Sequence, residues 1–181
     1  MARVANPADD RLDLRLDRTI AVPRHLIWKA WTEPTHIKKW WAPAPWSTVE
    51  CQINLRPGGI FRTVMRSPEG QDFPHEACVV ELVENERIVL TNALAPGYRP
   101  AADQLGADCA SITFTAIVTF TERAGRTHYS VLVLHKDEAG RKRHEEMGFH
   151  EGWGNASTRS SKSRGNSERG QTPRVHAAIS G

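Results

Sequence analysis

The sequence predicts an α+β domain in which a curved antiparallel sheet of about six strands is combined with helices at its two ends. Short segments through the middle of the chain alternate apolar with polar residues, as half-buried strands do. Helical spacing is confined to residues 23–41 and to the stretch after residue 136. Runs of strands flanked by helices are typical of α+β domains. The 181 residues, 39% of them hydrophobic, suit one such domain with its own core.

The N-terminal part predicts one strand and two short helices. Residues 1–10 are polar, and we expect them to be flexible. Residues 11–22 then alternate, which places the leucines of "RLDLRLDRTIAV" on one buried face. Pro23 suits the first turn of a helix. A second helix follows with Thr32 as its N-cap and Pro34 in its first turn, and "APAPW" ends it.

Six further segments are predicted to be strands, because β-branched and aromatic residues recur in them and turn signals separate them. In chain order they are "STVECQINL", "IFRTVMRS", "EACVVELV", "RIVLTNA", "SITFTAIVTF" and "THYSVLVLH". The intervening "RPGG" and "SPEGQ" are expected to be turns, and "ERAGR" to close a hairpin. The longer "LAPGYRPAADQLGAD" is expected to be a loop.

A terminal helix is predicted from about Asp137, because a strongly bent sheet needs a helix to cover its concave face. Gly148 and Gly152 weaken the helical pattern there. Residues 155–181 contain few sizeable apolar groups, so we expect a disordered polar tail after a domain at 11–154. A second explanation for the tail is a shifted reading frame. With one base restored, codons chosen for "STRSSKSR" encode an apolar stretch instead.

Charge and cysteine content narrow the class of protein. The net charge is +3, and the excess comes from the basic tail, so no nucleic-acid partner is expected. No apolar stretch reaches ~18 residues, so no membrane span is expected, and no signal peptide is recognisable. Cys51, Cys78 and Cys109 are widely spaced and odd in number. They fit reduced thiols in the cytoplasm better than a disulfide framework.

Four blocks of sequence carry a resemblance to a known family. They are "VPRHLIWKAWTEPTHIKKWWAP", "LRPGGIFRTVMRSPEG", "ERIVLTNAL" and "HEEMGFHEGWG". In this order they resemble the Aha-type branch of the START-like (SRPBCC) superfamily, homologues of the C-terminal domain of the heat-shock-protein ATPase activator. The resemblance covers residues 10–154 and implies a helix-grip fold, in which a curved sheet wraps around a C-terminal helix with an internal cavity between them. It does not by itself imply chaperone work.

The helix-grip fold brings three parts of this chain together around the implied cavity. These are the end of the second helix, the strand after "RPGG" and the "GFHEGWG" block. A tryptophan there supplies a large apolar area with a single N–H group to satisfy. We therefore expect the ligand-binding residues to be Trp41, Phe61, Met65, Phe149, His150 and Trp153.

Catalytic and metal-binding motifs are not recognisable. "HEEMGFH" does not fit the HExxH zinc pattern, because Gly148 stands where the second His is required. Glu146 and His150 are four residues apart and would meet on a helix as a hydrogen-bonded pair at the cavity wall. Any ionisable residue of a strand that points inward would be a candidate general acid or base. Four ionisable residues lie within or beside the predicted strands: His75, Glu76, His128 and His135.

The sequence thus predicts a cytoplasmic protein that binds a small hydrophobic or amphipathic molecule, with no metal and no cofactor. Two alternatives stay open. One is an enzyme of the cyclase or dehydratase type that uses a His or Glu in the cavity. The other is a module that binds a chaperone or a regulator protein. A homodimer is compatible with all three.

Overall fold

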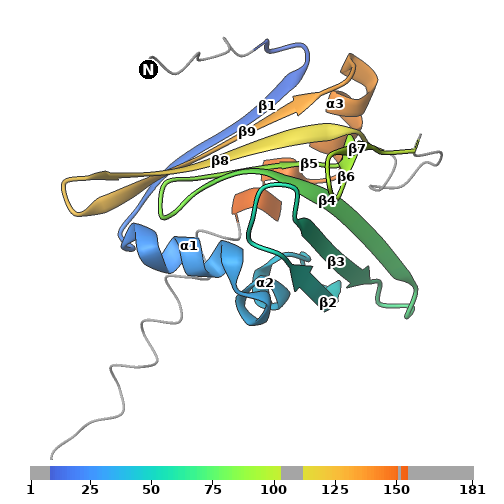
Figure 1. Cartoon of the computed structure of the whole chain (residues 1–181), viewed down its shortest axis with the longest axis horizontal. Coiled ribbons are helices and arrows are strands. Elements are labelled where there is room, and N and C mark those ends of the chain that lie inside the picture. Colours follow the sequence, from blue (N-terminus) through green and yellow to red (C-terminus); the bar gives the residue numbers. More distant parts are fainter. Residues whose placement is uncertain (1–8, 103–111, 151, 155–181) are drawn as a thin grey trace, which may run out of the picture.

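The computed structural model describes residues 9–102, 112–150 and 152–154 (Figure 1). The expectations for residues 1–8 and for the tail at 155–181, including the shifted reading frame, lie outside the described residues. None of the helices in the described part of the chain is long and apolar enough to cross a membrane.

The described elements follow one another in the predicted order, with helices near the two ends of the chain and strands between them. Their bounds are β1 (Asp13–Ile20), α1 (Arg24–Thr32), α2 (Pro34–Trp40), β2 (Ser47–Ile53), β3 (Ile60–Arg66), β4 (Asp72–Val83), β5 (Arg87–Thr91), β6 (Leu94–Ala95), β7 (Arg99–Pro100), β8 (Phe114–Arg123), β9 (Arg126–His135) and α3 (Glu138–Glu146).

One antiparallel sheet of seven strands dominates the fold, in the order β1-β9-β8-β5-β4-β3-β2. The predicted α+β class is confirmed, and the strand predicted at residues 11–22 joins the same sheet beside β9. The segment expected to be a loop contains a small ladder between β6 and β7, with two residues in each strand. The turn between β8 and β9 consists of Ala124 and Gly125, at φ 49 and φ 71. Positive φ at both positions matches the twist of a tight hairpin.

The core lies between the concave face of the sheet and the helices α1 and α2 (Figure 1). Alternation along β9 buries Tyr129, Val131 and Val133 on that face. From the helices, Trp31 and Trp40 meet at 4.8 Å between ring centroids. Burial of each such side chain stabilises the folded state by roughly 1.5–3 kcal/mol. The buried Trp40 side chain therefore holds the end of α2 against the core.

The C-terminal helix is interrupted at Gly148, one of the glycines that weaken its predicted pattern. The Asp137 side chain accepts a hydrogen bond from the Gly140 N–H at 2.7 Å and caps the start of α3. After Glu146 the chain passes through Gly148 at φ 89, a left-handed conformation that ends a right-handed helix. Helical conformation resumes at Phe149. Beyond the break, Phe149 belongs to the core and Trp153 packs against it.

Candidate functional site

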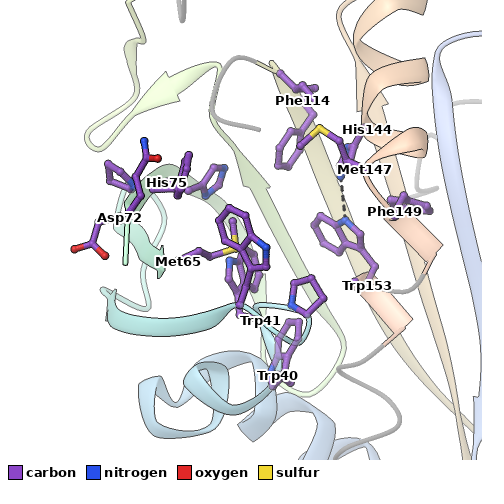
Figure 2. Close-up of a pocket in the computed structure, with 18 residues that line it drawn as sticks. Trp40, Trp41, Met65, Asp72, His75, Phe114, His144, Met147, Phe149 and Trp153 are labelled. Carbon is purple, nitrogen blue, oxygen red and sulfur yellow. Dashed lines mark hydrogen bonds between the residues drawn. The ribbon is translucent and has the colours of Figure 1, made fainter. Parts of the chain in front are cut away.

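A cavity of about 550 Å³ lies between the end of α2, the strands β3 and β4, the start of β8 and the segment after α3 (Figure 2). Its wall is mainly aromatic and aliphatic. The aromatic side chains of Trp and Phe that line it are Trp40, Trp41, Trp46, Phe73, Phe114, Phe149 and Trp153. Among the described residues that line it, the ionisable ones are Asp72, His75 and His144.

Trp41 enters the cavity because α2 ends there. Its backbone N–H donates to the Ile37 carbonyl oxygen at 3.0 Å and closes the last turn of the helix. The preceding Trp40 is held in the core by a hydrogen bond from its indole N–H to the Ala30 carbonyl oxygen at 2.8 Å. With Trp40 fixed, the Trp41 ring lies over Phe61, at 5.1 Å between ring centroids. The α2 end of the cavity is therefore a rigid aromatic wall.

The strands β3 and β4 form the opposite wall. Their register pairs Thr63 with His75 and Met65 with Phe73, so all four side chains lie on one face. The N-terminal half of β4 pairs only with β3, because the described pairing with β5 begins at Cys78. This half of β4 therefore carries its side chains past the body of the sheet and into the cavity wall.

The start of β8 is held in place by one buried amide. The side chain of Asn92 donates to the Ile112 carbonyl oxygen at 2.7 Å and accepts from the Phe114 N–H at 2.8 Å. Phe114 is thereby placed against His75, with the rings nearly parallel at 8° and their centroids 5.9 Å apart. The imidazole of His75 thus lies flat against an aromatic neighbour.

Three side chains from different parts of the chain form a series of hydrogen bonds at one wall of the cavity. His135 Nδ1 lies 2.9 Å from the Leu12 carbonyl oxygen, so this nitrogen donates. The other nitrogen of His135 then accepts from His144 Nδ1 at 2.9 Å. His144 Nε2 accepts from the indole N–H of Trp153 at 3.2 Å (Figure 2). All these bonds form together only when both imidazoles are neutral.

The electrostatics of the site agree with that requirement. Burial lowers the pKa of His144 from 6.5 to about 4, and the neighbouring His135 and His75 lower it further. Burial also lowers the pKa of His135, against the raising effect of its bond to Leu12. The hydroxyl of Tyr129 donates to the Trp153 carbonyl oxygen at 3.2 Å. Trp153 is consequently fixed at both its ring and its backbone.

His75 differs from the other two histidines. Both of its ring nitrogens are buried, and neither has a hydrogen-bond partner among the described residues. Burial alone lowers the pKa of His75 from 6.5 to about 4, so the ring is neutral at neutral pH. The hydroxyl of Thr63, directly across the strand pair, is likewise buried without a partner in the described part of the chain. Buried polar groups are rarely left unpaired, so this part of the wall requires an explanation.

The sequence and the fold of this chain are similar to those of known proteins. Residues 21–159 match the family described as Activator of Hsp90 ATPase homolog 1-like protein. The chain belongs to this family. The resemblance to the Aha-type branch of the START-like superfamily is therefore confirmed, as is the helix-grip class of the fold. No curated protein matches the chain.

Solved structures of proteins from several bacteria share the fold. A protein from Nitrosomonas europaea is 40% identical, with 89% of this chain and 99% of that chain covered and a TM-score of 0.79. A protein from Mycobacterium smegmatis is 21% identical, with 93% of this chain and 94% of that chain covered and a TM-score of 0.67. The AHSA1-like protein from Aeromonas hydrophila is 16% identical, with 92% and 100% covered and a TM-score of 0.62.

Four of the six residues that the sequence singled out line the cavity of this AHSA1-like chain. They are Trp41, Met65, Phe149 and Trp153. Phe61 is buried behind Trp41 and is not part of the lining. His150 is exposed and also lies outside the lining, because the break at Gly148 turns it away from the cavity.

The same break lies between Glu146 and His150, which were expected to form a hydrogen-bonded pair on one continuous helix. Glu146 ends α3 and forms an ion pair with Lys142 at 3.9 Å instead. Of the strand residues considered as acid–base candidates, His75 and His135 face the interior. Glu76 is exposed, and the remaining one, His128, approaches Asp17 at 3.4 Å.

Sequence reasoning did not select His75, His144 and Phe114 as lining residues. A signal for His75 exists, since it shares the parity of Phe73 and Ala77 along β4. For His144 no local signal exists, because its partners come from β9 and from the segment after α3. Within the described residues, no group of three or more His, Cys, Asp or Glu side chains is arranged to hold a metal ion.

Proposed function

We propose that this protein binds one small hydrophobic or amphipathic molecule in the cavity. The observation that supports this proposal is an aromatic-walled space of about 550 Å³ next to the core. Sites for small ligands have volumes of roughly 300–1,000 Å³ and are mostly apolar with a few polar groups. Tryptophan rings from α2 and from the segment after α3 would enclose the ligand from two sides.

Catalysis of the cyclase or dehydratase type is the second candidate, because two imidazoles, His75 and His144, line the same cavity. The hydrogen bonds of His144 argue against it. Both of its ring nitrogens are occupied, by His135 and by Trp153, so it has no free position from which to move a proton. A single imidazole without such constraint remains, which favours recognition of a ligand over acid–base chemistry.

A module that binds a chaperone or regulator is less well supported. Such a module needs a contiguous exposed apolar patch. Only three large apolar side chains are exposed in the described part of the chain: Leu55, Tyr98 and Met147. Free thiols at Cys51 and Cys78 support a cytoplasmic setting for ligand binding.

Two measurements test the proposal. Native mass spectrometry of the purified protein should reveal a co-purified small molecule. Titration with the neutral dye Nile red should give a rise in fluorescence that Met65→Trp reduces at least about tenfold in affinity, because the larger side chain fills the cavity. Leu55→Trp is the matched control, since it adds the same ring at an exposed position outside the lining. Equal dye binding by all three proteins would contradict a cavity site.

A further inference from the structure

We propose that His75 is the polar recognition group of the cavity, and that the ligand is a neutral molecule with a flat ring system and one hydroxyl or carbonyl group. This inference rests on the proposed binding function and specifies the chemical class of its ligand. It is carried by the nitrogens of His75, which have no partner among the described residues, by the rings around it and by the absence of Lys and Arg from the described lining.

The first observation concerns hydrogen bonds. Nδ1 and Nε2 of His75 are both buried and have no partner among the described residues. A neutral imidazole offers one donor and one acceptor, and leaving them unpaired in an apolar environment is costly. His135 and His144, a short distance away, have both nitrogens paired by the protein. Of the two imidazoles that line the cavity, only that of His75 therefore has hydrogen-bonding groups without a partner among the described residues.

The second observation concerns shape. The His75 ring lies nearly parallel to Phe114 and at 6.4 Å from Trp41 between ring centroids. Figure 2 shows its side chain extending from β4 toward these two rings. The torsion next to a His ring is broad, so a modest rotation turns either nitrogen toward the cavity. A ligand that hydrogen-bonds there meets aromatic faces on both sides, which favours a flat ring system.

The third observation concerns charge. Asp72 is the only carboxylate in the lining that the structure describes, and it is engaged by Arg66 in an ion pair at 2.6 Å. The described lining contains no Lys or Arg. A carboxylate or phosphate on the ligand would thus lose water without gaining a cation, and that loss is large in an apolar site. A hydroxyl or carbonyl group instead meets the single donor and acceptor of the imidazole.

The test compares two probes of the same ring system. Equilibrium dialysis at neutral pH would measure the affinities of 2-naphthol and 2-methylnaphthalene, which differ only in a hydroxyl against a methyl group. The preference for 2-naphthol should fall about tenfold in His75→Phe relative to the unmodified protein, because one hydrogen bond is lost. His150→Phe makes the same substitution at an exposed position and should leave the preference unchanged. His75→Gln, which restores a donor and an acceptor, should recover part of it.

The outcomes separate the inference from the proposed function. Loss of the preference in His75→Phe alone supports the inference. Equal affinity of the unmodified protein for both probes, or a preference that survives His75→Phe, overturns it while cavity binding stands. Failure of both probes to bind the unmodified protein overturns the proposed function as well. His75→Leu gives the same comparison if the phenyl ring does not fit.

Discussion

Acidification should destabilise this protein through two buried imidazoles. Burial lowers the pKa of His75 and of His144 from 6.5 to about 4 in the folded state. As the pH falls below 6.5, the unfolded chain takes up protons at these positions and the folded chain does not. The free energy of unfolding therefore decreases between about pH 6.5 and pH 4. Each imidazole contributes about 3 kcal/mol to that decrease, an appreciable part of the stability of about 5–15 kcal/mol typical of a domain.

Urea unfolding followed by tryptophan fluorescence measures this effect, at pH 7, 6, 5 and 4. The unmodified protein should lose stability steadily over the range. His75→Phe should lose about 3 kcal/mol less, because one of the two imidazoles is gone. At pH 7 the same variant should be more stable by about 1–3 kcal/mol, since an unpaired buried polar group has been replaced by an apolar ring. His150→Phe, at an exposed position, is the control.

The comparison between variants isolates the histidine effect from that of the carboxylates. Asp17 and Asp72 also have lowered pKa values, and their stabilising contribution is lost as the pH falls through those values. That loss is common to all the variants. If His75→Phe and the unmodified protein have the same pH dependence, or if His75→Phe is less stable at pH 7, the assignment of His75 as a buried neutral group without a partner is wrong.

Three further substitutions test the packing of the domain, each by urea unfolding at pH 7. Thr63→Val should raise the free energy of unfolding by about 1 kcal/mol, because its buried hydroxyl has no described partner. A decrease would show that the hydroxyl of Thr63 does form a hydrogen bond in the folded protein. Trp153→Ala should lower it by about 3 kcal/mol, and little change would show that the ring is not packed. Gly59→Ala should cost more than about 2 kcal/mol, since a Cβ there would lie 2.0 Å from the Asn54 carbonyl oxygen. Gly152→Ala meets no atom within 4 Å and should be tolerated, so equal costs at the two glycines would refute the close contact.

The fold was predictable because its signals are local. Alternation marks β8 and β9, and the Ala-Gly turn between them is recognisable from neighbouring residues alone. The N-terminal half of β4 was not recognised as a strand. Pro74 and the charged and polar residues around it interrupt the apolar pattern, and they are tolerated because this half pairs on one side only.

The candidate site was predictable only in part, for a different reason. Large apolar residues such as Trp41 and Trp153 indicate a cavity wall by their type and by the segments that carry them. His150 was expected in the cavity wall but lies outside it. The glycines in this stretch indicate a weak helix, but they do not reveal that Gly148 adopts φ 89 and turns the chain. The bonds of His135 and His144 join three elements far apart in the chain, so no sequence window contains them.

The pairing of β1 with β9 has a consequence for how the protein is made. Ile20 pairs with Thr127, so the first strand finds its neighbour only after almost the whole domain has been synthesised (Figure 1). Contacts between distant parts of a chain form slowly, and an unpaired strand edge invites association with other chains. A nascent polypeptide that stops before residue 126 exposes the edge of β8. Until its last strand emerges from the ribosome, this domain is therefore an aggregation-prone chain that depends on rapid completion or on protection by the cell.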